Sequence, residues 1–416
     1  MSMGVRRLFL LVAAIALFDM LFHAAVAPLL PYYREELGFS KAAAGVLTAA
    51  YAAGTLAGTL PGLWLAMRLG ARRTVLVGLA LMAASTLLFA FAGELASLDV
   101  ARFLQGIGGA CAWIGALSWL MLEAGPKRRG ELIGGVLAGA VAGEVLGPVV
   151  GSAATVTSPQ LVFSVLAGLA TLLLWTARAT PYAAPGRPVE PTAPRRAGVA
   201  GAPMLAGSWL ITLPAIFAGV VTVLGPLRLD ELGASGAAIG AVWLLAAGAE
   251  ATLSPLVGRL SDRRGRMLPI RTGLACAIPA ALVLPLPGDP ILEGFAIVAT
   301  VVALAGFWAP SIASLSDTAE ATGTNHALAF ALVNAGWAGG HVVGGAGGAA
   351  LADATTDAAP YGILSVLCLL TLAASLSRRS PLRWGGLQPH AFAAGVRSRP
   401  PWRRVRLPPR RATRSR

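Results

Sequence analysis

The sequence is poor in charged residues, and this scarcity excludes an ordinary water-soluble domain. Of its 416 residues, 12% are charged and 56% are hydrophobic, whereas a soluble globular domain carries roughly 25% charged residues. Apolar runs of about 20 residues recur along the chain, and each is long enough to cross a hydrocarbon core of roughly 30 Å. The composition therefore predicts an all-α integral membrane protein.

The sequence also lacks the usual signatures of enzymes and of ATP-driven machines. It contains no GxxxxGK[ST] phosphate-binding loop, no HExxH pair and no recognisable set of nucleophile, base and acid. Its three cysteines, Cys111, Cys276 and Cys368, fall inside apolar runs and lack metal-ligand spacing. We interpret them as small core residues, and we expect no enzymatic activity, no cofactor and no metal site.

Twelve apolar runs are candidate membrane spans. They cover residues 7–31, 42–66, 74–92, 97–122, 132–156, 160–177, 204–227, 237–258, 267–287, 291–313, 325–351 and 359–377. The first run has no small-residue cleavage site and is too long for a signal peptide. A stretch rich in Pro, Ala, Gly and Arg divides the spans six and six. We expect an N-terminal six-helix bundle (1–177), a flexible linker (178–203), a C-terminal six-helix bundle (204–377) and a basic, disordered tail (378–416).

Basic residues mark one side of the membrane. The short connections on one side carry most of the arginines, at positions 6, 7, 68, 72, 73, 128, 129, 259, 263, 264 and 266. The positive-inside rule then places both termini in the cytoplasm of a multi-pass cell-membrane protein. The tail holds 12 arginines and no acid, against a net charge of +14 for the chain. Next to a bilayer, such a tail favours anionic lipid, and we expect no nucleic-acid binding.

The two halves are repeats of one another. A shift of 195 positions superposes the Glu36-Leu37-Gly38 triplet on Glu231-Leu232-Gly233. A shift of 197 superposes the glycines of span five on those of span eleven, namely Gly139, Gly143, Gly147 and Gly151 on Gly336, Gly340, Gly344 and Gly348. Glycine at every fourth residue lets helix backbones approach closely. These faces, and a third at Gly54, Gly58 and Gly62, serve either static packing or the sliding of two rocking halves.

Four sequence motifs carry a family resemblance. Span one contains Leu17-Phe18-Asp19-Met20-Leu21, and span four contains Asp99, Arg102, Gln105, Gly106, Gly108 and Gly109 at characteristic spacing. Span five combines its glycines with Pro148, and span eight is followed by Gly258-Arg259-Leu260-Ser261-Asp262-Arg263-Arg264-Gly265-Arg266. Over residues 7–377 the sequence resembles the major facilitator superfamily, and within it the twelve-span drug:proton antiporter branch.

The resemblance implies a fold and a set of working parts. The fold is twelve transmembrane helices in two pseudo-symmetric six-helix bundles. The resemblance assigns proton coupling to Arg102. It assigns conformational roles to Gln105 and Gly106 of the same motif and to the gating motif with Gly258, Asp262, Arg263, Gly265 and Arg266. The first-half counterpart of the gating motif departs from the pattern, because Met67 stands where an acid is expected. We therefore expect a weakened charge latch there, with Arg72 and Arg73 binding lipid headgroups or a neighbouring helix end.

Four ionisable residues lie near the expected bilayer midplane: Asp19, Glu144, Glu250 and His341. A carboxylate at this depth costs at least roughly 2.5 kcal/mol, so it needs a partner, water or a function. Asp19 is the first candidate for holding a proton or a cationic substrate, with His23 one helical turn further on. The alternative is a structural Asp19 paired permanently with a neighbouring helix.

The other midplane residues leave similar alternatives open. The repeat places His341 at the position equivalent to Glu144, so an acid and an imidazole either exchange a proton across a cavity or each make a packing hydrogen bond. Glu250 likewise either takes part in proton exchange or makes a packing hydrogen bond. Arg102 either reaches toward Asp19 or pairs with Asp99 or a carbonyl. Six aromatic residues are candidates for an apolar cavity lining: Trp113, Trp119, Trp243, Phe307, Trp308 and Trp337.

The predicted function is proton-coupled efflux of a small hydrophobic or cationic organic compound by alternating access, as in multidrug resistance. The expected partners are this substrate, protons and membrane lipids, and we expect a monomer. An uptake permease for a small nutrient is the alternative within transport, and the Gly147-Pro148 motif opposes it. A non-transporting membrane sensor with the same fold is the third interpretation, and the midplane ionisable residues oppose it.

Overall fold

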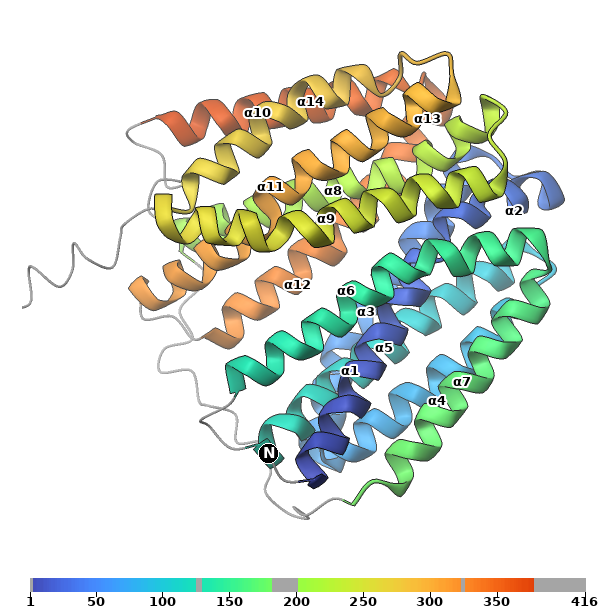
Figure 1. Cartoon of the computed structure of the whole chain (residues 1–416), viewed down its shortest axis with the longest axis vertical. Helices are drawn as coiled ribbons and strands as arrows, with labels where there is room; N and C mark the ends of the chain where they lie inside the picture. The colour runs from blue at the N-terminus through green and yellow to red at the C-terminus, as the bar shows by residue number, and fades with distance from the viewer. Residues whose placement is uncertain (1–2, 125–128, 182–200, 323–325, 378–416) are drawn as a thin grey trace, which may run out of the picture.

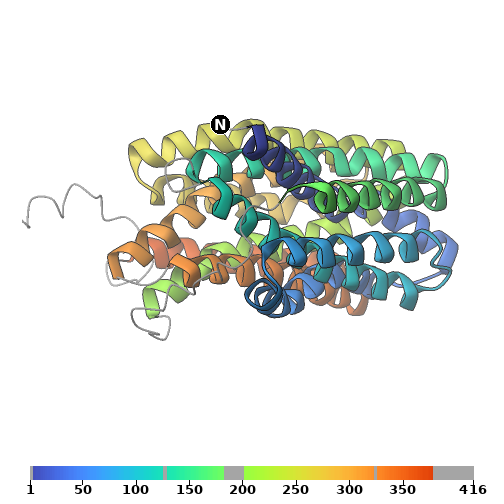
Figure 2. The same ribbon diagram turned by 90° about the horizontal axis from the view of Figure 1, so that it is seen from below.

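The computed structural model describes residues 3–124, 129–181, 201–322 and 326–377. Regular structure in these ranges is helical, without a strand. The expected tail (378–416) and most of the expected linker (178–203) lie outside the described residues. The helices run nearly parallel to one another (Figures 1 and 2), as the all-α membrane fold class requires.

The N-terminal half contains seven α-helices and one 3-10 turn within its described residues. They are α1 (Met3–Ala24), η1 (Ala27–Leu29), α2 (Leu30–Leu37), α3 (Lys41–Leu69), α4 (Ala71–Ala90), α5 (Leu95–Ala124), α6 (Arg129–Val156) and α7 (Pro159–Ala179). The C-terminal half follows with α8 (Ala202–Glu231), α9 (Gly236–Arg264), α10 (Met267–Val283), α11 (Pro290–Thr322), α12 (His326–Val342), the π-helical η3 (Val343–Gly348), α13 (Ala349–Ala354) and α14 (Ala358–Leu376).

The structure contains the twelve expected crossings, but the helices begin and end at other residues than the sequence predicts. In the described ranges, ten helical segments are long and apolar enough to span a membrane, with α1 to α2 forming one segment of 35 residues. The shorter α10 is the ninth crossing, and α12, η3 and α13 together make the eleventh. The sequence ends span eight at residue 258 and places the gating motif in the connection after it, which is wrong for most of the motif. Helix α9 continues to Arg264, and the turn begins only at Gly265, whose φ is +88°.

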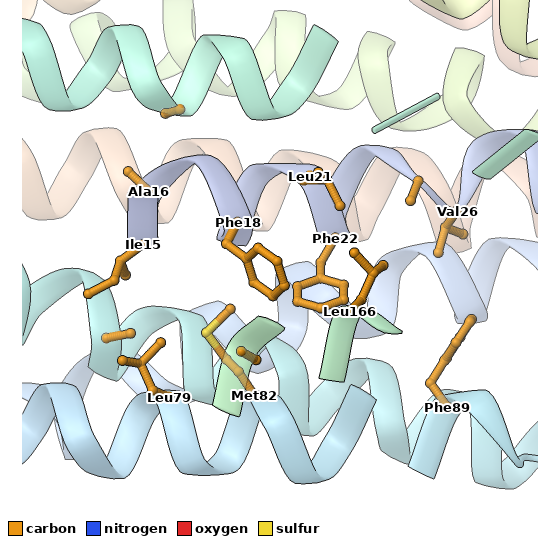
Figure 3. Packing of buried hydrophobic residues seen from close by; sticks show 14 of the residues in the cluster. Ile15, Ala16, Phe18, Leu21, Phe22, Val26, Leu79, Met82, Phe89 and Leu166 are labelled. Carbon is orange, nitrogen blue, oxygen red and sulfur yellow. The ribbon is translucent and has the colours of Figure 1, made fainter. Parts of the chain in front are cut away.

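Each half has its own apolar core. In the first half, α1 packs on α4 and α7, and Figure 3 shows Phe18 and Phe22 directed at Met82 and Leu166. The Phe18 and Phe22 rings meet edge to face with centroids 4.8 Å apart. These side chains are at most 6% exposed, so this face of α1 is fixed against its own half.

The glycine faces lie inside the halves and not between them. Gly139, Gly143 and Gly147 of α6 contact the backbone of α1, and Gly151 contacts Ala25 just beyond its end. In the second half, Gly336, Gly340 and Gly344 contact the backbone of α8, and Gly348 contacts its Val220 side chain. The third face, Gly54, Gly58 and Gly62, contacts α5. Of the two interpretations offered by the sequence, the contacts match packing within each half. These three glycine faces are therefore not the surfaces along which the two halves would slide.

The contact at Gly143 makes a stability prediction. A methyl group there would lie 2.8 Å from the carbonyl carbon of Leu17, so the backbone of α1 or α6 would have to shift. We expect Gly143→Ala to destabilise the protein by about 1–3 kcal/mol, the usual cost of overpacking. Gly134→Ala on the same helix is the matched control, because nothing lies within 4 Å of that position. Thermal unfolding in detergent measures both, and equal melting temperatures would contradict the assigned packing.

The two halves are joined by ion pairs at one end of the molecule. Lys41 Nζ lies 2.7 Å from Asp357 Oδ2 and 3.2 Å from Glu231 Oε1. Arg34 Nη1 adds a second contact to Glu231, at 3.2 Å. We call this end, which carries α2, the α2 end (Figure 1). Among the described residues, the ion pairs between the halves all lie here.

The halves separate along α6 and α9 toward the opposite end. Near the α2 end, Ser152 Oγ donates to the Gly236 carbonyl, at 3.2 Å. From there the two helices diverge (Figure 1), and nothing lies within 4 Å of a methyl group placed on Gly248 or Gly258 of α9. On the other side of the interface, α12 and α3 stay in contact through Asn334 Nδ2 and Thr59 Oγ1, 3.1 Å apart.

Candidate functional site

A chamber of about 210 Å³ lies between the halves. Its ionisable lining residues come from both sides, with His23 and Glu144 from the first half and Glu250 and His341 from the second. Apolar and aromatic residues complete it: Met20, Ala24, Ala27, Pro148, Pro214, Ala218, Val221, Thr222, Trp243, Ala246, Ala247, Val301, Leu304, Trp308 and Trp337. Four of the six residues proposed for coupling therefore share one cavity.

The two glutamates face the chamber without a direct partner. Glu144 is exposed to it and Glu250 is half-buried, and neither makes a hydrogen bond or ion pair with any side chain in the part of the chain that the structure describes. Both line the same chamber, one from each half. Two carboxylates from opposite halves thus form an acidic site whose charge must be met by protons, water or a cationic ligand.

The two histidines meet on the other wall of the chamber. The ring centroids of His23 and His341 lie 5.5 Å apart, and Trp337 lies against both. His341 Nδ1 is 2.9 Å from the Trp337 carbonyl. Because a carbonyl only accepts, this nitrogen carries the proton and Nε2 of the neutral ring is the acceptor. His23 Nδ1 is buried and has no hydrogen-bond partner among the described residues.

Asp19 does not line the chamber and instead lies behind it. Its side chain is buried, and its Oδ1 accepts a hydrogen bond of 2.6 Å from the Tyr51 hydroxyl of α3. Gly109 of α5 leaves the space that the Asp19 carboxylate occupies, because a methyl group on Gly109 would overlap it. Asp19 is therefore paired with a neighbouring helix, the geometry of the alternative interpretation, while His23 one turn on reaches the chamber.

Arg102 reaches backbone carbonyls of α1 and not the Asp19 carboxylate. Its Nη1 donates to Phe22 O at 2.8 Å and to Gln105 Oε1 at 3.2 Å. The guanidinium carbon lies 4.9 Å from the centre of the Tyr51 ring. Gln105 Nε2 in turn donates to Thr86 Oγ1 of α4, at 3.2 Å. Tyr51 thus connects Asp19 to the Arg102 group, and the sequence did not single it out.

Gly106 and Pro148 occupy positions of close helix approach. A methyl group on Gly106 would come within 2.7 Å of Thr55 N, so this glycine sets the distance between α5 and α3. The Pro148 side chain lines the chamber, and its carbonyl faces Gly240 of α9 at the interface of the halves. Pro148 therefore belongs to the chamber, whereas Gly106 belongs to the α3–α5 contact within the first half.

The gating motif at the end of α9 is tied to α11. Arg266 forms ion pairs with Asp262 and with Asp317 Oδ2, the latter at 3.0 Å. Partial burial lowers the pKa of Arg266, but its hydrogen bonds to Asp317 and Asp262 raise it, and the net shift is upward. Arg263 is exposed, and Gly258 has no close neighbour. Asp317 is a partner that the sequence motif did not identify.

The first-half counterpart uses other contacts in place of the missing acid. Met67 is 41% exposed. Arg72 donates to the Arg178 carbonyl at the end of α7, and its guanidinium carbon lies 6.0 Å from the Trp119 ring centre. Of the two partners expected for Arg72, the observed one is the neighbouring helix end.

Two further expectations need correction. Cys276 was interpreted as a core residue, but it is exposed on α10, while Cys111 and Cys368 are buried. Of the six aromatic candidates, Trp243, Trp308 and Trp337 line the chamber. Trp113, Trp119 and Phe307 do not, because Trp119 and Phe307 are fully buried within their halves and Trp113 packs against the first core.

Comparison with known families agrees with this architecture. A family model described as Major Facilitator Superfamily matches residues 12–324, well over half of the chain. The chain belongs to the Major Facilitator Superfamily. It is accordingly a multi-pass membrane transporter and not an enzyme.

Curated relatives match only part of the chain. The MFS-type transporter ppzB of Metarhizium rileyi is 33% identical over 122 residues, which are 28% of this chain and 25% of that protein. An uncharacterized MFS-type transporter of Schizosaccharomyces pombe is 32% identical over 130 residues, 30% of this chain and 29% of that protein. The aligned region thus spans less than a third of the length of these relatives, and nothing about their substrates transfers directly.

Solved transporters share the fold at low identity. A bacterial homologue of the human lysosomal transporter Spinster has a TM-score of 0.69 and 16% identity, over 88% of this chain and 94% of that one. The xylose transporter XylE from E. coli has a TM-score of 0.70 and 14% identity, over 90% and 97% of the two chains. These likenesses confirm the major facilitator fold expected from the sequence.

Proposed function

We propose that this transporter exports a small, apolar, cationic organic compound in exchange for protons, by alternating access. The observation that carries the proposal is the chamber, in which Glu144 and Glu250 face each other from opposite halves among three tryptophans. An ammonium or guanidinium group is attracted both by a carboxylate and by the face of an indole ring. Aromatic and aliphatic walls suit the apolar remainder of such a compound.

Competition for the same carboxylates supplies the coupling. In the form open to the cytoplasm, the two glutamates lose protons and bind the cation. In the form open to the outside, protons driven by the inward gradient return to them and displace it. Each cycle then exchanges protons for substrate, because the two carboxylates bind either protons or the cation and not both at once. His23 and His341 line the same chamber as the glutamates and are proposed to relay protons to and from them.

Membrane orientation follows from the basic connections. The positive-inside rule places both termini in the cytoplasm, and so places the α2 end at the outer surface of the cell membrane. The arrangement with ion pairs at the α2 end and diverging α6 and α9 at the other end is then an inward-facing one. The Gly147-Pro148 motif, which resembles that of antiporters, supports export over uptake.

The test is a proton-gradient assay in everted membrane vesicles containing the full-length protein. With the lumen acidified by respiration, adding a transported cation should raise the luminal pH, because each imported cation releases protons. A panel of hydrophobic amines and quaternary ammonium compounds should include active members, and neutral analogues of the same size should be inactive. Vesicles lacking the protein provide the baseline for passive leakage.

Two outcomes would overturn the proposal. If intact cells accumulate the compound when the protein is present, the transporter is an uptake permease. If no cation in the panel changes the gradient while neutral or anionic nutrients do, the substrate class is wrong.

A further inference from the structure

A second cavity lies at the α2 end, separate from the chamber. Its volume of about 400 Å³ falls within the roughly 300–1,000 Å³ of small-molecule sites. No residue lines both cavities. Lys41 is its lining residue from the first half, and the others come from α8, α11, α13, α14 and the connections that follow α10 and α13. Nothing in the proposed transport cycle uses this cavity.

Glu293 is the unusual group in this second cavity. It lies in the first turn of α11 and is 1% exposed, yet its Oε2 has no hydrogen-bond partner in the part of the chain that the structure describes. A carboxylate near a helix N-terminus gains from the helix dipole. The dipole does not replace direct donors, however, and a buried carboxylate oxygen without one is costly. Glu293 Oε2 therefore has no direct donor among the described residues, although Arg228 is near enough to act on the carboxylate through its charge.

The neighbouring cations are already engaged elsewhere. Lys41 contacts Asp357 and Glu231 at 2.7 and 3.2 Å. Arg228 Nη2 donates to the Pro287 carbonyl at 3.1 Å, and its Nη1 lies 3.8 Å from Glu231. Glu293 forms an ion pair with neither Lys41 nor Arg228 within the described ranges. The remaining wall is mixed: Thr355, Thr356 and Asp357 are polar, and the apolar part consists of Leu224, Leu284, Pro285, Ala352, Ala358 and Tyr361.

We propose that the second cavity binds a small organic ammonium compound, with its charged group on Glu293 and its apolar part against the Leu284, Pro285 and Tyr361 wall. A charge-assisted hydrogen bond from an ammonium would satisfy the orphaned Glu293 oxygen. The volume admits a small organic compound. The site is independent of the chamber, so it can exist whether or not the proposed export reaction is correct.

The test is a binding titration on the full-length protein in nanodiscs, with benzylammonium and methylammonium as probes. Glu144→Gln/Glu250→Gln is the background, because it removes the chamber carboxylates as competing sites. Isothermal titration calorimetry should then still detect saturable binding of benzylammonium, and none of benzyl alcohol. In that background, Glu293→Gln should weaken binding by at least about tenfold, as expected for the loss of a charge-assisted contact.

Two more variants keep the result interpretable. Ala358→Phe fills the cavity from an exposed position and should also abolish binding without touching a carboxylate. Asp353→Asn removes an exposed carboxylate on α13 that does not line the cavity, and it should leave binding unchanged. The proposal is overturned if neither ammonium probe binds in the chamber-neutral background, or if the Glu293→Gln protein binds them as well as its parent. Proton-coupled export in the vesicle assay would stand in either case.

Discussion

Neutralising Glu144 and Glu250 together should abolish proton-coupled export while leaving the protein folded. The Glu144→Gln/Glu250→Gln variant keeps the size of both side chains but removes the groups that exchange protons for cation. A charge-assisted hydrogen bond contributes about 1.5–3 kcal/mol, which corresponds to roughly 10- to 100-fold in substrate affinity for each carboxylate. The double variant should therefore show no response above leakage in the vesicle assay.

The single variants separate the roles of the two glutamates. If either one alone holds the coupling proton, one single variant should lose the pH response completely while the other retains it with weaker substrate affinity. Glu36→Gln is the matched control, because that residue is exposed on α2 and does not line the chamber. Full export by the double variant would place the coupling site elsewhere, and Asp19→Asn, behind the chamber, would be the next variant to measure.

Reversing the charge of Lys41 should open the α2 end. Lys41, Glu231 and Asp357 are 17%, 30% and 24% exposed, so each pair is partly screened and contributes about 0.2–1 kcal/mol. Loss of both Lys41 pairs should shift the balance between closed and open forms by roughly 2- to 30-fold. Lys41→Glu adds repulsion from Glu231 and Asp357 and should exceed Lys41→Gln in its effect.

Distances between spin labels at positions 36 and 354 measure this opening. Both positions are exposed, and they lie in opposite halves at the α2 end. Labelling requires removal of the exposed Cys276. Lys41→Glu should lengthen the dominant distance, and the swap Lys41→Glu/Asp357→Lys should restore it. Arg34→Gln, which removes a single contact to Glu231, is the milder control. An unchanged distance in Lys41→Glu would show that the ion pairs do not hold this end closed.

Much of the fold is predictable because lipid imposes a simple rule. Each crossing must be an apolar helix with its backbone satisfied internally, so hydropathy locates the twelve crossings even where α10 is short and η3 interrupts the eleventh. The repeat of glycines also predicts close helix packing. The glycine spacing does not predict the partner helix, because it is the same for a contact within a half, as at Gly143 and Gly344, and for a contact between halves.

The chamber is partly predictable for the same reason. Charged residues are rare enough in apolar helices that Glu144, Glu250 and His341 stand out, and His23 follows from its position one turn beyond Asp19. Tyr51 does not stand out, because a tyrosine in a helix is unremarkable until its hydroxyl is found on Asp19. Lys41 and Asp357 are 316 positions apart, and Glu293 resembles an ordinary helix-start acid, so their significance depends on tertiary contacts that the sequence does not state.

The π-helical segment η3 divides the eleventh crossing into two parts with different neighbours. On one side of it, His341 faces the chamber; within it, Gly345 lies against Gly45 of α3 near the α2 end. A π-helical turn holds one more residue than an α-helical turn. Its return to α geometry would rotate one part against the other by about 100°, the angle of one residue. His341 could then turn away from the chamber while the contact with α3 stays in place.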